Sequence, residues 1–163
     1  MSLITLGLTK IEVGAIAVDG GMSTTLATLG YTHADSCKMV TEDPTVTEHY
    51  AEEVDDPVAS VSKKGKTIVT WSIMDPDADA LADVLGGTAT LGVWESPDTQ
   101  PIIEKSVKIT PNVGFSIEIP RASITGKINA EFSKKGIFLV DMKATVMMPT
   151  KAATKAIKTT PLV

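Results

Sequence analysis

Residues 52–87 read EEVDDPVASVSKKGKTIVTWSIMDPDADALADVLGG, and this stretch decides the fold. It contains, in order, an acidic loop, a basic turn at 63–66, an alternating strand at 67–74 and a short helix that ends in two glycines. In the strand, Val69, Trp71 and Ile73 alternate with polar residues, which predicts one buried face and one polar face. The stretch therefore predicts a half-buried sheet strand joined directly to one helix.

The helix is predicted at about residues 76–85. Asp75 is expected as the N-cap and Pro76 as the first helical residue, because a carboxylate accepts the free amides there and proline needs no partner. Gly86 is expected to end the helix with a positive φ angle. An apolar stripe at helical spacing consists of Ala78, Leu81, Val84 and Leu85.

Alternating segments on both sides of this stretch predict antiparallel strands. Strands are expected at 10–18, 36–41, 45–51 and 102–109, with a further short one at 88–93. Three longer segments follow at 113–119, 122–132 and 138–148, separated by turns at Pro120-Arg121 and at 134–136. The predicted fold class is mainly β, an antiparallel β-sandwich or small β-barrel with one flanking helix and a long projecting loop or hairpin.

Length and composition predict a single domain spanning residues 1–163. The chain has 43% hydrophobic and 21% charged residues, as is usual for globular proteins. The single cysteine, Cys37, permits no internal disulfide, and no apolar run approaches the roughly 20 residues of a membrane helix. No signal-peptide pattern opens the sequence, so we expect synthesis in the cytoplasm. Residues 150–163 carry three lysines and are interpreted as a flexible C-terminal arm.

Charge is divided unequally along the sequence. Residues 1–100 contain 16 acidic and 5 basic residues, whereas residues 101–163 contain 4 acidic and 10 basic residues. If these halves form different faces, copies of the chain attract each other head to tail; the alternative is that the charges intermix once folded. Between Glu42 and Asp56 there are seven acidic residues and no lysine or arginine, which predicts a segment that projects from the body.

The sequence favours no catalytic, cofactor or metal site. Asp75, Asp77 and Asp79 have the first spacing of a calcium loop, but Ala80 and Gly86 replace its required glycine and glutamate. His33, His49 and Cys37 lack zinc-site spacing. The acidic loop contains paired carboxylates such as a glycosidase uses, but aromatic residues to hold a sugar are only 4% of the chain. The protein is therefore not expected to be an enzyme, and tight nucleic-acid binding is disfavoured by the acidic net charge.

The order of the segments resembles the middle of a phage major tail tube protein. The resemblance rests on the acidic loop with DDP, then KKGK, the alternating strand, DPDADAL and LGGT, and it covers residues 20–90 best. MSTTLATLG at 22–30 and TED at 41–43 agree with it. It implies a β-barrel or sandwich with a flanking helix, assembled into hexameric rings that stack into a hollow tube through which DNA passes during ejection without specific binding.

The resemblance also implies a loop that reaches from one ring to the next, and residues 41–57 match it best. The acidic inter-subunit contacts are then expected at Glu42, Asp43, Glu48, Glu52, Glu53, Asp55 and Asp56. Their basic partners are expected among Lys63, Lys64, Lys66, Lys151, Lys155 and Lys158. Implied partners are further copies of the chain and other tail proteins at the tube ends, with no membrane; the implied location is the virion tail.

Two alternatives stay open. A tube protein of a contractile injection or secretion system would share the ring. A monomeric β-sandwich binding module would need an exposed aromatic platform, for which Trp94 is the candidate because Trp71 alternates with core residues.

Overall fold

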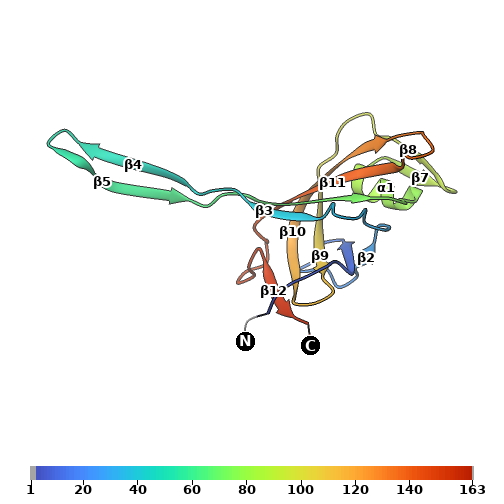
Figure 1. Cartoon of the computed structure of the whole chain (residues 1–163), viewed down its shortest axis with the longest axis horizontal. Helices are drawn as coiled ribbons and strands as arrows, with labels where there is room; N and C mark the ends of the chain where they lie inside the picture. The colour runs from blue at the N-terminus through green and yellow to red at the C-terminus, as the bar shows by residue number, and fades with distance from the viewer. Residues whose placement is uncertain (1–2, 163) are drawn as a thin grey trace.

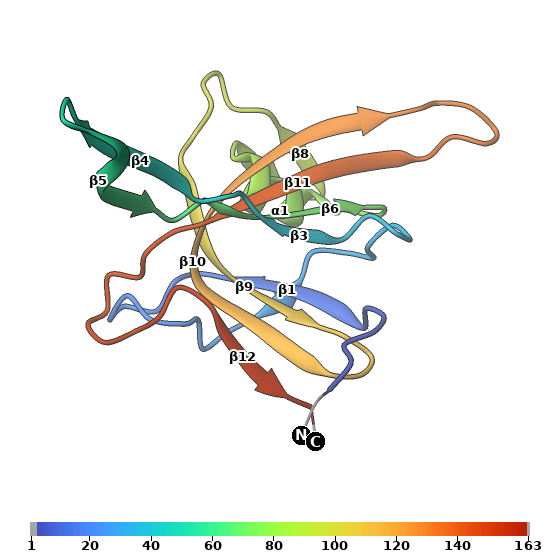
Figure 2. The same cartoon turned by 60° about the vertical axis from the view of Figure 1, so that its left-hand side comes forward.

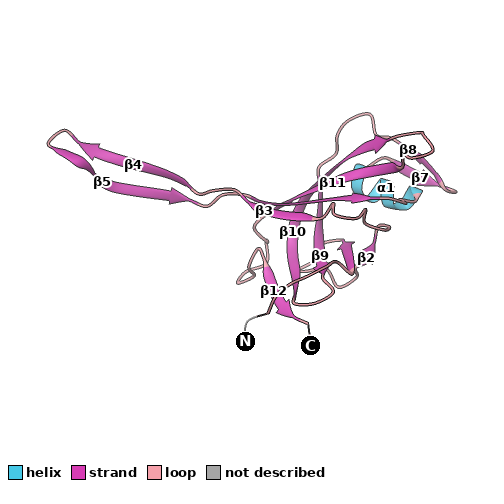
Figure 3. Cartoon of the chain, in the orientation of Figure 1, coloured by secondary structure: helices cyan, strands magenta, loops and turns pink. Residues whose placement is uncertain are grey.

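The computed structural model describes residues 3–162 as twelve strands and one helix. Figure 3 shows that nearly all regular structure is β, with the helix at one end of the body. The elements are β1 (Lys10–Gly14), β2 (Ala27–Thr28), β3 (Lys38–Thr41), β4 (Thr45–Ala51), β5 (Val54–Lys63), β6 (Thr67–Ile73), α1 (Ala78–Leu85), β7 (Thr88–Thr90), β8 (Val93–Glu95), β9 (Ile103–Thr110), β10 (Phe115–Ala130), β11 (Phe138–Val146) and β12 (Lys158–Pro161). The predicted fold class, antiparallel β with a single helix, is confirmed.

One antiparallel sheet forms the body, in the order β2-β1-β9-β10-β11-β6-β3, with β12 paired to β10. The sheet folds over on itself. In Figure 2, β1, β9 and β12 lie in a lower layer, β11, β6 and β3 lie in an upper layer, and the long β10 runs through both. Apolar side chains between the layers make one core, which gives the molecule its sandwich form.

The core confirms the predicted inward faces. Val69, Trp71 and Ile73 of β6 lie opposite Ala144, Met142 and Val140 of β11, and all six are buried. Trp71, expected to be a core residue, is 3% exposed. The alternation of apolar and polar residues predicted the buried side chains correctly, because each strand has one face against the other layer.

The expected turn at Pro120-Arg121 is wrong, because β10 continues through it as a β-bulge. Ile119 pairs with Val107 and Ala122 pairs with Lys105, so Pro120 and Arg121 together oppose Ser106. The Ser106 hydroxyl donates to the Pro120 carbonyl at 2.7 Å. A bulge tolerates a proline, which has no amide to donate, and it bends the strand so that its two halves enter different layers.

The helix begins two residues later than predicted. Asp77, not Asp75, is the N-cap: its carboxylate accepts from the Ala80 amide at 2.7 Å. Asp75 instead accepts from the Tyr31 amide, and Pro76 lies before the cap. Gly86 ends the helix with φ 79°, as predicted. Val84 and Leu85 bury the apolar side of α1 in the core.

Other differences are local. The first strand ends at Gly14 instead of residue 18, and residues 88–95 form a hairpin of β7 and β8 instead of one strand. The turn of this hairpin holds Leu91 and Gly92 at positive φ. The C-terminal segment interpreted as a flexible arm contains β12, which pairs with β10 from Phe115 to Glu118; residue 163 lies outside the described residues.

Candidate functional site

A two-stranded hairpin projects far from the body. We call residues 45–63, which comprise β4 and β5, the acidic hairpin. β4 and β5 pair only with each other, and neither contacts any other strand or the helix (Figure 1). Pairing runs from Thr45 opposite Lys63 at the base to Ala51 opposite Val54 at the tip. β5 has ten residues, so the acidic hairpin is about 33 Å long.

The acidic hairpin is the projecting segment that the sequence predicted, but the predicted C-terminal boundary of that segment was wrong. The expected segment, residues 41–57, stops halfway along β5. Pro57 was interpreted as its end, yet it pairs with Tyr50 beside a register irregularity and the strand continues to Lys63. Proline is accepted in an exposed, irregular strand because no further strand needs its amide.

Both faces of the acidic hairpin are in solvent. Apart from Ala51, every residue of β4 and β5 is exposed. Its exposed apolar side chains are Val46, Tyr50, Val54, Val58 and Val61. An isolated two-stranded hairpin is marginally stable in water at best. The acidic hairpin is thus a long, exposed segment held only by its own strand pairing and by the links at its base.

The structure separates the seven predicted acidic residues into two groups. Glu42 and Asp43 lie at the base, on the link between β3 and β4. The others lie along β4 and around the tip, residues 50–57: Glu48, Glu52, Glu53, Asp55 and Asp56. None of the seven makes an ion pair within residues 3–162.

Glu48 alone among the seven accepts a side-chain hydrogen bond in the described chain. The Tyr50 hydroxyl donates to it at 2.6 Å, and this bond raises the pKa of Tyr50. The four carboxylates of the tip face only water, so their charges are available to a partner.

Four of the six predicted lysines lie together. Lys64 and Lys66, on the link between β5 and β6, and Lys151 and Lys155, on the segment before β12, line one hollow of about 660 Å³. We call it the basic hollow. Lys63 does not line it, and Lys158 lies 4.0 Å from Glu118 instead. Residues nearly ninety positions apart in sequence thus form one positively charged surface at the base of the acidic hairpin.

Apolar side chains make up much of the remaining wall of the basic hollow. The larger ones are Val146, Met147, Met148 and Ile157, and no acidic residue lines the basic hollow. Met148, the last residue of the strand predicted at 138–148, is 80% exposed. Because Pro149 follows, β11 ends at Val146 and the alternation no longer applies. The Met-Met-Pro sequence was the signal that could have shown these residues to lie outside the strand.

Lys151 differs from the other lysines of the basic hollow because its charge is paired. Its ammonium lies 2.6 Å from the Asp19 carboxylate. This hydrogen bond, together with one from the Gly21 amide, holds the pKa of Asp19 below its usual value. Lys64, Lys66 and Lys155 make no ion pair among the described residues.

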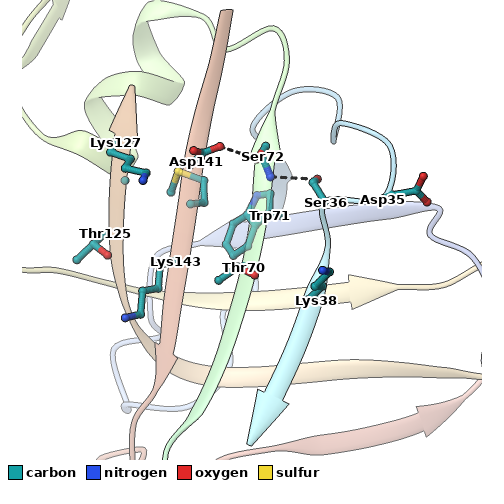
Figure 4. Close-up of a pocket in the computed structure, with 12 residues that line it drawn as sticks. Asp35, Ser36, Lys38, Thr70, Trp71, Ser72, Thr125, Lys127, Asp141 and Lys143 are labelled. Atoms are coloured by element: carbon teal, nitrogen blue, oxygen red, sulfur yellow. Dashed lines mark hydrogen bonds between the residues drawn. The ribbon is translucent and has the colours of Figure 1, made fainter. Parts of the chain in front are cut away.

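A second hollow, of about 630 Å³, lies on the polar face of the upper layer (Figure 4). Lys38, Thr70, Lys143 and Thr125 form a cross-strand row over it. Asp141 accepts from the Ser72 hydroxyl at 2.7 Å and, outside this hollow, from the Asn129 side chain at 3.2 Å. The row combines hydroxyl and ammonium groups on a sheet surface, with no converging acid, base and nucleophile.

The residues considered as an aromatic platform, a reactive thiol or metal ligands are placed as follows. Trp94, the candidate for an aromatic platform, is half-buried and donates to the Gly86 carbonyl at 2.9 Å. Cys37 is half-buried, and burial raises the pKa of its thiol. Within residues 3–162 no group of three or more His, Cys, Asp or Glu is placed to hold a metal ion.

No family model matches the chain, and no curated protein matches it. In the described part of the chain, no helix has the length and apolar character to cross a membrane.

Proposed function

We propose that this chain is a structural subunit that assembles with copies of itself into hexameric rings stacked as a phage tail tube. One observation carries the proposal: the acidic hairpin contacts nothing in its own subunit beyond the links at its base. Its exposed valines and unpaired carboxylates are the groups that contact with another chain would cover. The resemblance of residues 20–90 to tail tube proteins supplies the kind of assembly.

Open sheet edges support the same proposal. β3 pairs only with β6, so its outer edge has unpaired backbone groups, and both outer edges of the acidic hairpin are equally open. Val40 on β3 is 61% exposed. Exposed edges invite pairing with another chain, and a closed ring of subunits completes them.

In this proposal the tube conducts double-stranded DNA during ejection without binding it specifically. The partners are further copies of the chain and the tail proteins that cap the tube. The tube functions in the virion tail after synthesis in the bacterial cytoplasm. An assembly whose charges are matched between subunits also agrees with the acidic first part and basic last part of the sequence.

The test is sedimentation velocity over a range of protein concentrations. The wild-type chain is expected to form large species as concentration rises. The variant with Glu52, Glu53, Asp55 and Asp56 all changed to lysine is expected to stay a folded single subunit. Unchanged assembly of this variant would contradict a role for the tip.

A further inference from the structure

The basic hollow has an excess of positive charge that its own subunit does not neutralise. Three lysines on it lack an ion-pair partner within residues 3–162: Lys64, Lys66 and Lys155. Lys151 is paired with Asp19, and no carboxylate lines the wall. Like charges held near each other raise the energy of the free subunit, so the hollow favours an acidic occupant.

The tip of the acidic hairpin has the matching composition. Glu52, Glu53, Asp55 and Asp56 surround Val54, which is 48% exposed, and Tyr50 and Val58 beside them are 60% and 59% exposed. The hollow offers apolar side chains between its lysines, including Met147 and Met148, whose flexible side chains adapt to a partner. Charge and apolar character are therefore complementary on the two surfaces.

The tip cannot fill the hollow of its own subunit. Lys64 and Lys66 lie at the base of the acidic hairpin, and β5 separates them from the tip by about 33 Å of extended strand. Figure 1 shows the hairpin pointing away from the body that carries the hollow. A tip from a second copy has no such restriction.

We infer that the basic hollow is the receptor for the acidic tip of a second copy of this chain. The inference rests on the proposed self-assembly and identifies the surface through which it occurs. Each copy offers one tip and one hollow, so the contact is heterologous and repeats from copy to copy, producing a closed ring or a continuing filament. Neighbouring copies are then displaced by about the length of the acidic hairpin, roughly 30 Å.

Exchange of charges between the two surfaces tests the inference. The tip variant carries Glu52→Lys, Glu53→Lys, Asp55→Lys and Asp56→Lys, which makes the tip positive. The hollow variant carries Lys64→Glu, Lys66→Glu and Lys155→Glu. In each variant alone, tip and hollow have the same sign, so we expect the concentration needed for assembly, measured by sedimentation velocity, to rise on the order of a hundredfold or more. In an equimolar mixture, the basic tip meets the acidic hollow and the acidic tip meets the basic hollow. The mixture is expected to assemble with the two variants in equal amounts.

A control variant carries Lys134→Glu and Lys135→Glu in the turn between β10 and β11, away from the basic hollow, and is expected to assemble as the wild type does. All the variants are expected to fold, because the changed side chains are exposed. Denaturation curves check this. Normal assembly of the hollow variant would overturn the inference. Failure of the folded variants to co-assemble would overturn it too. A wild-type chain that stays a single subunit at every concentration would instead overturn the proposed function itself, together with this inference.

Discussion

Removal of the acidic hairpin should leave the fold intact and abolish assembly. The base provides a natural junction: Glu42 opposes Lys66, and the Glu42 amide donates to the Lys66 carbonyl at 2.8 Å. Replacement of residues 43–65 by Asn-Gly converts β3 and β6 into a hairpin with a two-residue turn, for which Asn-Gly is the preferred sequence.

The expected change in the free energy of unfolding follows from what is removed. Neither strand of the hairpin contacts another element, so no core burial is lost. Replacing residues 43–65 by two residues halves the length of the connection more than three times, and each halving lowers the entropic cost of loop closure by about 0.6 kcal/mol. The shortened subunit should therefore be as stable as the wild type or more stable by up to about 2 kcal/mol.

Denaturant unfolding followed by the fluorescence of Trp71, which is buried, measures this stability below the concentration at which the wild type assembles. Sedimentation velocity measures assembly on the same samples. A shortened subunit that unfolds would show that the hairpin supports the fold, and one that assembles normally would show that it is not the contact.

Three further predictions concern the body. Arg121 donates two hydrogen bonds to Glu104, each 2.9 Å, and lowers the pKa of Glu104. This pair therefore stabilises the fold fully above about pH 5 and less as the pH falls through the lowered pKa. In denaturant titrations, the difference in unfolding free energy between the wild type and Glu104→Gln should shrink between pH 7 and pH 3. Ile119→Ala, at a site with no exposure, should cost about 3 kcal/mol of unfolding free energy by the same titration, whereas Ile102→Ala, at an 89% exposed site, should change it by less than about 0.5 kcal/mol. Gly87→Ala should lower the melting temperature, because Gly87 has φ 88° and an added Cβ would lie 2.0 Å from the Glu95 carbonyl oxygen. An unchanged melting temperature would contradict the close approach of the helix end to β8.

Sequence patterns predicted those elements whose environment is set locally. The alternation in β6 identified Val69, Trp71 and Ile73 as core, because this strand has one face against the opposite layer. The negative run between Glu42 and Asp56 predicted a segment away from the core, since unpaired carboxylates are not buried.

The errors arose where tertiary structure overrides the local signal. Pro120-Arg121 suggested a turn, but the apolar alternation changes phase there, from Ile119 to Ala122, and this change is what a bulge produces. Asp75 and Asp77 are equally suited to cap a helix, and only the contact of Asp75 with Tyr31, far away in sequence, decides between them.

The candidate site was predicted in its parts and not in its arrangement. Both groups of lysines were named as partners of the acidic loop through the family resemblance, but a sequence pattern does not bring Lys64 beside Lys155. That proximity depends on the path of the chain after β11, through Pro149 and back along β10 as β12.

Assembly through the acidic hairpin can be seen by negative-stain electron microscopy of the purified wild-type chain, over increasing protein concentration at low and high salt. We expect rings or stacked tubes at high concentration and low salt, and fewer of them as salt screens the contact between carboxylates and lysines. Single particles of one-subunit size under every condition would contradict the claim that this chain assembles through its acidic hairpin.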